Sequence, residues 1–265
     1  MPPANPDSNV PAILWPLAFA ILSVTALWLV SLRLEDASII DIWWGPAIAL
    51  AADLAAFGGA PLGIGAIAAL GLVNLWAIRL GAHIFIRHRK LGEDYRYAQM
   101  RAKFGSRWWW WSLFQVFLLQ GILIWVVALP LIVTAMQGQL RLGLGAIAGF
   151  LLAAGGLIFE AVADAQLTRF RADGANKGRV MDRGLWAWSR HPNYFGDTMM
   201  WWGFFVIGWS ASGSWWLLES PVIMTVLLLK ISGVSLLEET ITLRRPGYGD
   251  YMRRTSAFIP WPPVK

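Results

Sequence analysis

The 265-residue chain contains no cysteine, only three histidines and few charged residues, which make up 14% of the sequence. Without cysteine it can form no disulfide, no thiolate nucleophile and no cysteine-ligated zinc or iron–sulfur site. Three scattered histidines do not favour a histidine-built metal centre, so we expect no metal. The scarcity of charge is matched by 57% hydrophobic residues and 18 Trp. This composition lies outside the range of soluble domains and indicates a membrane protein.

Long uncharged runs recur at the length of a membrane-spanning helix. The first carries no charge over its 21 positions, and a helix of that length crosses ~30 Å of hydrocarbon. Because the preceding residues lack the basic start of a signal peptide, we expect this helix to be retained. The pattern predicts an all-α, polytopic membrane protein with about seven transmembrane helices, at residues 12–32, 39–58, 62–86, 112–135, 142–164, 196–214 and 219–237.

The cations alternate between the connections of these helices. Seven Lys or Arg lie between the third and fourth runs, six between the fifth and sixth, and five after the seventh, whereas the connections GGAP, AMQGQ and ASGSW carry none. By the positive-inside rule, we expect the basic segments and the C-terminus in the cytoplasm and the N-terminus outside. The net charge of +6 therefore follows topology, and the expected partner is the lipid bilayer, the inner membrane if the protein is bacterial, and not a nucleic acid.

Two segments, GIGAIA at 63–68 and GLGAIA at 143–148, match the glycine-rich phosphate-binding fingerprint of dinucleotide-binding folds. That fingerprint requires a loop that follows a β-strand and opens a soluble βαβ unit. Both segments instead begin membrane spans, where small residues allow helices to approach closely. We therefore expect helix packing at these positions.

Polar side chains gather in three segments that the predicted topology assigns to the cytoplasmic side, 87–107, 160–197 and 238–251. Ionisable groups at membrane depth are costly and commonly mark a functional cavity. Arginines and a helix N-terminus can hold phosphates, while carboxylates and amides can hold ribose hydroxyls or a carboxamide. The set suits a nucleotide-containing cofactor that enters from the cytoplasm.

The stretch SRHPNYFGD, at 189–197, resembles a membrane reductase superfamily when read with its neighbours EAVADAQ, RGLW, EET and YGDYMRRTSAFIPWPP. The superfamily contains steroid 5-alpha-reductases, sterol C14 and C7 reductases, and bacterial members of the DUF1295 type. The resemblance covers most of residues 75–263. A shorter RHPxYxG core also occurs in isoprenylcysteine carboxyl methyltransferases and related phospholipid methyltransferases, but Asn193 and Asp197 give the form that is associated with the reductases.

The resemblance implies that NADPH lies in a cytoplasm-open pocket formed by the last helices and their loops. We expect Pro192 to set the first turn of a helix there and Gly196 to permit close approach of the cofactor. A single membrane domain, 1–265, would then place the lipid substrate against residues 11–140 and the cofactor motifs in 141–265. The positions that match the family imply cofactor-binding roles for Asp164, Arg171, Arg179, Arg190, Asn193, Tyr194, Asp197, Glu239, Tyr248 and Tyr251.

Two departures from the steroid 5-alpha-reductases concern the proton donor. No Gln-Glu pair occurs in an early helix, and Trp76 stands about where a tyrosine of the third span would lie. The remaining candidates for the proton donor are Asp41 and His83, and after them Asp53. A desolvated carboxylic acid can remain protonated at neutral pH. Asp41 could equally be the N-cap of the second helix.

The sequence therefore predicts an NADPH-dependent reductase of an activated C=C bond in a steroid-like or isoprenoid-like lipid. One alternative is an S-adenosylmethionine-dependent membrane methyltransferase, because an acidic and aromatic pocket also suits a sulfonium cofactor. Another is a lipid-binding or transport protein without chemistry. That last class commonly distributes polar residues along a transmembrane path and shows inverted-repeat symmetry, neither of which the sequence displays.

Overall fold

A computed structural model describes residues 9–57, 59–231, 238 and 247–264. These residues form α-helices joined by short helical turns and loops, and no strand occurs among them. The predicted all-α class is therefore confirmed. Within the described residues, no group of three or more His, Asp or Glu side chains is placed to hold a metal ion.

Five helical segments are long and apolar enough to cross a membrane. Four of them correspond to α1 (Asn9–Leu34), α2 (Ile39–Phe57), α3 (Ile64–Leu91) and α7 (Leu144–Ala172). The fifth is a continuous run, Tyr95–Gln137, made of α4 (Tyr95–Phe104), α5 (Trp108–Ser112), a π-helical stretch (Leu113–Leu118) and α6 (Leu119–Gln137). These five helices confirm the predicted multi-pass membrane character.

The sixth and seventh predicted spans correspond to α8 (Pro192–Ser212) and to α9 (Glu219–Val226), which continues to Ile231. Neither is among the five segments above. The 21 residues of α8 include an asparagine, an aspartate and three tryptophans, which lower its mean hydropathy. Of the predicted span 219–237, the part from 232 to 237 lies outside the described residues.

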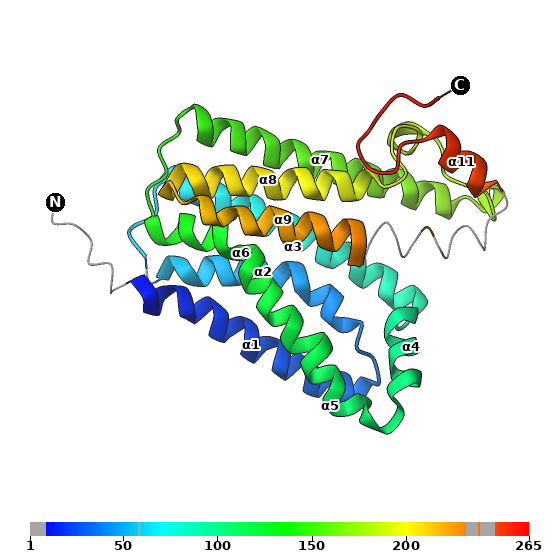
Figure 1. The fold of residues 1–265 in the computed structure, drawn as a ribbon, viewed down its shortest axis with the longest axis horizontal. Coiled ribbons are helices and arrows are strands. Elements are labelled where there is room, and N and C mark those ends of the chain that lie inside the picture. Colours follow the sequence, from blue (N-terminus) through cyan, green and yellow to red (C-terminus); the bar gives the residue numbers. More distant parts are fainter. Residues whose placement is uncertain (1–8, 58, 232–237, 239–246, 265) are drawn as a thin grey trace. The chain divides into compact units, whose positions relative to one another are not determined.

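Residues 1–146 and 207–217 form one of two compact units. In it, α1 and α3 each pack on α2, and α6 packs on α1 and α2 (Figure 1). Fully buried side chains such as Ile40, Trp76 and Leu131 fill this unit. A Cβ on Gly65 would lie 2.6 Å from the carbonyl oxygen of Leu140, so the first glycine-rich segment serves close packing, as expected.

The connection between α3 and α6 is helical, whereas the sequence predicted a basic linker before residue 112. Asp94 caps α4 by accepting a hydrogen bond from the Arg96 backbone N–H, and Gly105, with φ of 51°, ends that helix. The chain then turns into α5 (Figure 1). Trp109 and Trp110 are exposed on α5, as expected of an interfacial tryptophan belt.

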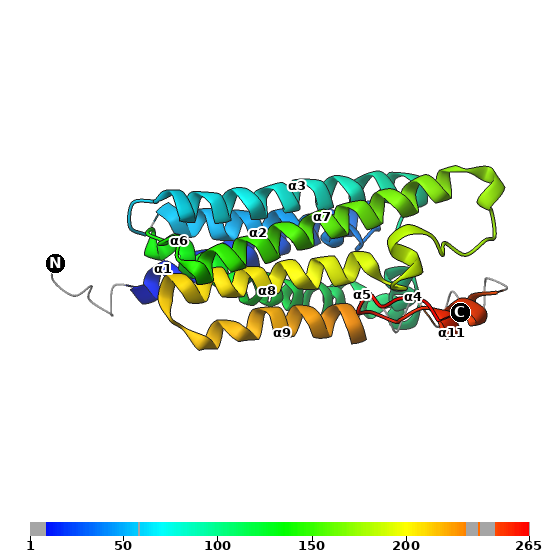
Figure 2. The ribbon, with the colours of Figure 1, turned by 90° about the horizontal axis from the view of Figure 1, so that it is seen from above.

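Residues 147–206 and 218–265 form the other unit, in which α7 and α8 run side by side (Figures 1 and 2). Glycines bring the two backbones together at successive turns. A Cβ on Gly156 would lie 2.5 Å from the Gly196 carbonyl oxygen, and one on Gly203 would lie 2.5 Å from the Ala153 nitrogen. The contact is therefore made by backbone against backbone, which only glycine allows at these positions.

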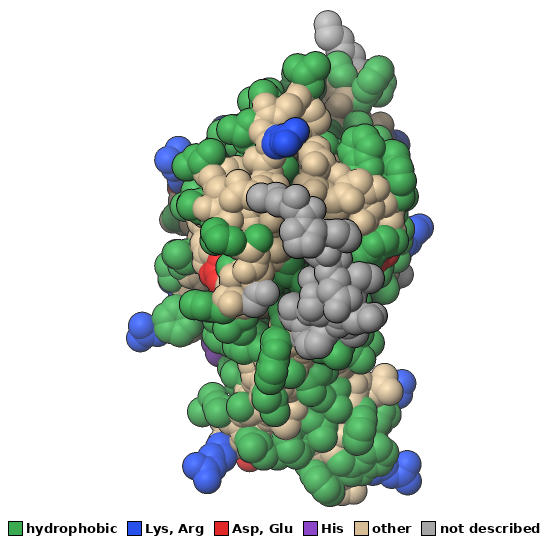
Figure 3. Space-filling model, turned by 90° about the vertical axis from the view of Figure 1, so that its left-hand side faces the viewer, with side chains coloured by type: hydrophobic (Ala, Val, Ile, Leu, Met, Phe, Trp, Pro, Cys, Tyr) green, Lys and Arg blue, Asp and Glu red, His purple; other side chains and the backbone are tan. Residues whose placement is uncertain are grey.

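Hydrophobic side chains also cover much of the protein surface. On the face drawn in Figure 3 they spread broadly, and Lys and Arg side chains stand singly among them. Exposed residues include Leu22, Ile78 and Leu151, each about 70% accessible. Such a surface suits contact with lipid.

Candidate functional site

The stretch that precedes α8 is fastened to the C-terminal segment of the chain. The Arg190 backbone N–H donates to the Ser256 carbonyl at 2.9 Å, and the Trp261 N–H donates to the Trp188 carbonyl at 2.9 Å. The Ser189 hydroxyl is fully buried and donates to the Phe258 carbonyl at 2.8 Å. Residues 188–190 and 256–261, far apart in sequence, thus form one local structure at the start of α8.

Arg190 is the centre of this structure. Its Nε donates to Glu238 Oε1 at 2.7 Å and its Nη2 to Glu238 Oε2 at 3.1 Å, a bidentate pair. Its Nη1 donates to the carbonyls of Met252 and Thr255, at 2.9 and 3.0 Å. Four of the five N–H donors of the guanidinium are used in this way, so the contacts assign Arg190 first to holding the C-terminal segment.

His191 adds a second contact to the same carboxylate. Its Nε2 lies 3.1 Å from Glu238 Oε1, and its ring stacks on Tyr194 with centroids 5.7 Å apart. Burial would raise the pKa of Glu238, but the hydrogen bonds from His191 and Arg190 bring it below the usual value. Glu238 is therefore a carboxylate at neutral pH. Its neighbour Glu239, for which the sequence predicted a cofactor-binding role, lies outside the described residues.

Two tyrosines of α11 (Tyr248–Arg254) are buried beside this ion pair. The Tyr251 hydroxyl donates to the Trp186 carbonyl at 2.5 Å. Burial, and then the charge of Glu238, raises the pKa of Tyr248 to about 12, and burial raises the pKa of Tyr251 as well. Both remain neutral phenols at physiological pH, and Tyr251 supports the backbone before α8.

The first turns of α8 carry the two residues that distinguish the reductase form of the motif. Asn193 Nδ2 donates to Asp164 Oδ1 on α7 at 3.1 Å. Asp197, one turn further, is buried, and its Oδ1 accepts from Trp201 Nε1 at 3.1 Å. The structure thus brings Asn193 of α8 and Asp164 of α7 together. The buried Asp197 lies one turn further along α8.

Gly196 does not have the role expected from the sequence. A Cβ at this position would lie 2.5 Å from the Glu160 nitrogen and 2.8 Å from the Gly156 carbonyl oxygen. The bare backbone of Gly196 therefore faces α7 and not a bound cofactor. Helix packing explains the glycine fully, because no side chain fits between the two backbones.

The two arginines proposed for phosphates lie at the end of α7 and on the connection that follows it. Arg171 is in the last turn of α7, and Arg179 follows the short helical turn Gly174–Asn176. Both side chains are exposed. They are thus surface cations, one at the end of α7 and one on the connection that leads into the RGLW and SRHPNYFGD stretches.

In the unit formed by residues 1–146 and 207–217, Asp41 lies in a polar cluster that was not predicted from the sequence. Its Oδ2 accepts from Arg96 Nη2 at 2.9 Å and its Oδ1 from the Tyr97 hydroxyl at 2.7 Å. Gln120 Nε2 in turn lies 3.4 Å from the Tyr97 oxygen. Because Asp41 is in the first turn of a helix that begins at Ile39, and its carboxylate contacts α4, the N-cap alternative is wrong.

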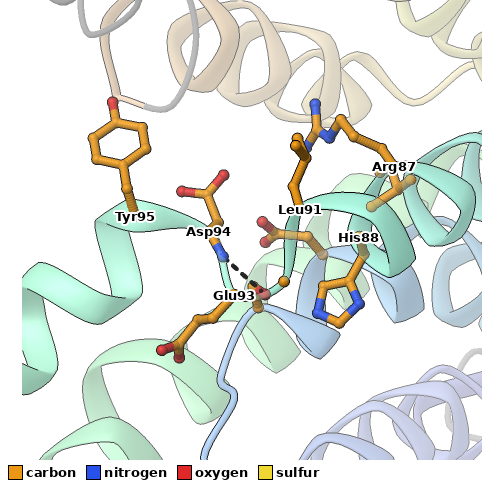
Figure 4. A pocket seen from close by; sticks show the side chains of 10 residues that line it. Arg87, His88, Leu91, Glu93, Asp94 and Tyr95 are labelled. Atoms are coloured by element: carbon orange, nitrogen blue, oxygen red, sulfur yellow. Dashed lines mark hydrogen bonds between the residues drawn. The ribbon is translucent and has the colours of Figure 1, made fainter.

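Asp41 also lines a cavity of about 240 Å³ at the ends of α2 and α3. In Figure 4, Arg87 and His88 extend from α3, and Asp94 and Tyr95 from the start of α4. The Asp94 N–H donates to the Ser38 hydroxyl at 3.2 Å, which joins the two sides. Burial would raise the pKa of Asp94, but hydrogen bonds and charge from Arg96 bring it below the usual value. His83, the other catalytic candidate, lies on α3 and is not among the lining residues.

The sequence contained only part of the information needed to identify Arg96 and Tyr97 as partners of Asp41. Both lie in a segment that the sequence analysis singled out as polar and basic, 87–107, but nothing in the sequence pairs them with Asp41, 55 and 56 residues away. The contact depends on α4 folding as a helix after the turn at Asp94. The sequence predicted a connection there and therefore no fixed partner.

Comparison with known proteins gives a family and no described activity. The model of the family DUF1295, described as a protein of unknown function, matches residues 27–255. No curated protein and no solved structure matches the chain.

Proposed function

We propose that this chain, which belongs to the DUF1295 family, is a membrane-embedded NADPH-dependent reductase of an activated C=C bond in a lipid. The observation that carries the proposal is the entrance of α8. Asn193 there meets Asp164 of α7, and the turn before it is held rigid by Arg190, Glu238 and Tyr251. A site built on fixed helix ends suits a cofactor that must be oriented closely.

The side chains proposed to hold the cofactor are of the chemical types that bind a dinucleotide. Asp164, Asn193 and Asp197 are hydrogen-bonding groups of the type that bind ribose hydroxyls or a carboxamide. Arg171 and Arg179 are the type that binds phosphates, and they would favour the extra phosphate of NADPH. NADPH, when bound, would supply the hydride, and the proton that completes the reduction would come from water or from one of the two candidate donors, Asp41 and His83.

The polar cluster around Asp41, taken by itself, is of a kind that binds a polar group of a lipid. In both of its contacts Asp41 is the acceptor, so its carboxylate holds Arg96 and Tyr97 in place. We assign to this cluster the binding of a polar group of the lipid, such as a conjugated carbonyl. Exclusion of water by the surrounding apolar helices would protect the reacting carbons.

A cofactor screen tests the assignment against its alternatives. We expect NADPH to raise the melting temperature of the purified protein by mass action, and NADH and S-adenosylmethionine to do so less or not at all. Arg171→Ala and Arg179→Ala should weaken NADPH by about ten- to a hundredfold, as expected for the loss of ~1.5–3 kcal/mol per charged contact. Asn193→Ala and Asp197→Ala should abolish NADPH-dependent reduction of an enone lipid in folded protein.

Arg169→Ala is the matched control, because Arg169 is an exposed arginine in the same last turn of α7 and should leave NADPH affinity unchanged. Stabilisation by S-adenosylmethionine together with methyl transfer to a prenylcysteine or a phospholipid would replace the reductase by a methyltransferase. Binding of lipid with no response to either cofactor would indicate a protein without chemistry.

The proposal includes the topology, with seven spans, the N-terminus outside and the cofactor site on the cytoplasmic side. A reporter fused after Lys265 should therefore read cytoplasmic, and one inserted in the GGAP connection should read external, because the basic connections alternate with uncharged ones. Fusions at the uncharged ASGSW connection serve as the internal control. An external C-terminus would contradict both the orientation and the cofactor entrance.

A further inference from the structure

A second cavity, of about 510 Å³, lies along α2 between α1 and α3 and is lined by apolar residues and one glycine. Its volume is within the ~300–1,000 Å³ range of small-ligand sites. Since α1 and α3 each pack on α2, they form the two walls and α2 forms the floor. The lining residues are Leu27, Val30, Leu34, Ile39, Ile42, Trp43, Pro46, Ala77, Ile78, Gly81, Ala82 and Phe85.

The floor of this groove is set by small residues. A Cβ on Gly81 would lie 3.3 Å from Pro46 Cγ, and one on Gly45 would lie 3.5 Å from the Ala77 Cα. Close approach of α2 and α3 therefore makes the floor deep, while Val30 and Ile78 on the walls remain 46% and 70% accessible. The groove is an open apolar slot in helices that are suited to cross a membrane.

One end of the groove is cationic. On α3 the lining residues Ile78, Ala82 and Phe85 follow three- and four-residue spacing, and the next position of that stripe is Arg89. The Arg89 guanidinium lies 5.9 Å from the centroid of the Phe85 ring. On α1, Arg33 comes directly before the lining residue Leu34. Because α1, α2 and α3 follow one another through short turns, the C-terminal ends of α1 and α3 lie at the same end.

These two arginines are available to a ligand. Both are exposed, and in the part of the chain that the structure describes neither forms an ion pair with a carboxylate. The nearest acids on the turn after α1 are Glu35 and Asp36, and Asp36 is already paired with His88 at 2.6 Å. The other end of the groove, around Trp43, Pro46 and Ala77, carries no charge.

We propose that this groove is a binding site for an anionic glycerophospholipid of the bilayer. One acyl chain lies along α2 between α1 and α3, and the phosphate headgroup lies against Arg33 and Arg89. The apolar lining fits the chain, the charge at one end fits the headgroup, and the position in a membrane-spanning bundle supplies the ligand. The site is independent of the proposed reductase activity.

The test uses phosphatidylglycerol with a photoactivatable diazirine in its acyl chain, incorporated with the full-length protein into phosphatidylcholine nanodiscs. We expect labelled peptides from Val30, Ile78 and Ala82, and competition by excess unlabelled phosphatidylglycerol. The same diazirine chain on phosphatidylcholine should label the groove more weakly. Arg33→Gln and Arg89→Gln should each weaken labelling about fivefold, the factor that corresponds to ~1 kcal/mol per cation near an anionic lipid.

Matched variants separate a specific site from bulk lipid. Ala82→Trp fills the groove from an exposed position and should remove the competable labelling. Leu151→Trp, at an exposed site on α7, and Lys177→Gln, an exposed cation outside the groove, should not. Equal labelling of the region around Leu151, equal labelling by the phosphatidylcholine probe, or labelling unchanged in Ala82→Trp and both arginine variants would each overturn the proposal.

Discussion

Replacing Arg190 with alanine is expected to lower the free energy of unfolding by roughly 3–5 kcal/mol, the usual cost of breaking a buried ion pair from one side. The Arg190 and Glu238 side chains are only 10% and 15% accessible. Without the guanidinium, the buried Glu238 carboxylate would lose its bidentate partner, and the Met252 and Thr255 carbonyls would each lose a donor. Thermal and denaturant unfolding in detergent measure the change.

Arg254→Ala is the matched control. Arg254 lies on α11, the helix that Arg190 contacts through the Met252 carbonyl, but it pairs with Asp182 at 3.7 Å and is 54% accessible. Exposed pairs contribute only about 0–1 kcal/mol, so this variant should unfold almost as the parent does. Equal losses in both variants would contradict the central role of the buried pair.

The lowered pKa of Glu238 predicts how the stability contributed by the Arg190–Glu238 pair changes at acidic pH. Because the folded-state pKa is lowered from the ordinary 4.5, the stabilisation is complete above pH 4.5 and is lost as the pH falls through the folded value. The acid side of the stability profile should therefore flatten in Arg190→Ala, where the partner that lowers this pKa is missing, and should stay unchanged in Arg254→Ala.

Gly196→Ala is expected to destabilise the unit that contains α7 and α8 by about 3 kcal/mol or more, the upper range of overpacking. The added Cβ would lie 2.5 Å from a backbone nitrogen and 2.8 Å from a backbone oxygen of α7. Backbone cannot rotate away as a side chain can, so the two helices would have to separate. Loss of the Asn193 to Asp164 hydrogen bond, and of affinity for the proposed cofactor NADPH, should accompany the loss of stability.

Gly71→Ala adds the same atom to α3 at a position with nothing within 4 Å. Because alanine favours a helix over glycine by roughly 0.5–1 kcal/mol, this variant should be as stable as the parent or slightly more stable. Equal unfolding of Gly196→Ala and Gly71→Ala would show that α7 and α8 do not depend on the glycine contact.

Much of this protein follows from the sequence alone. Runs of about 20 apolar residues must satisfy their backbone hydrogen bonds internally in lipid, so length and hydropathy were sufficient to predict an all-α membrane protein. The local chemistry of SRHPNYFGD was equally readable, because Pro192 begins a helix and Asn193 and Asp197 fall one turn apart on it.

Only the tertiary structure decided which of these groups meet. The sequence could not show that Glu238 pairs with Arg190, that Gly196 faces α7, or that Tyr97 meets Asp41 across 56 residues. Spacing along one helix determines which side chains share a face, but the partner opposite that face depends on how separate helices pack. The sequence therefore determined the kind of protein and its polar segments, while helix packing determined the ion pairs, the glycine contacts and the cavities.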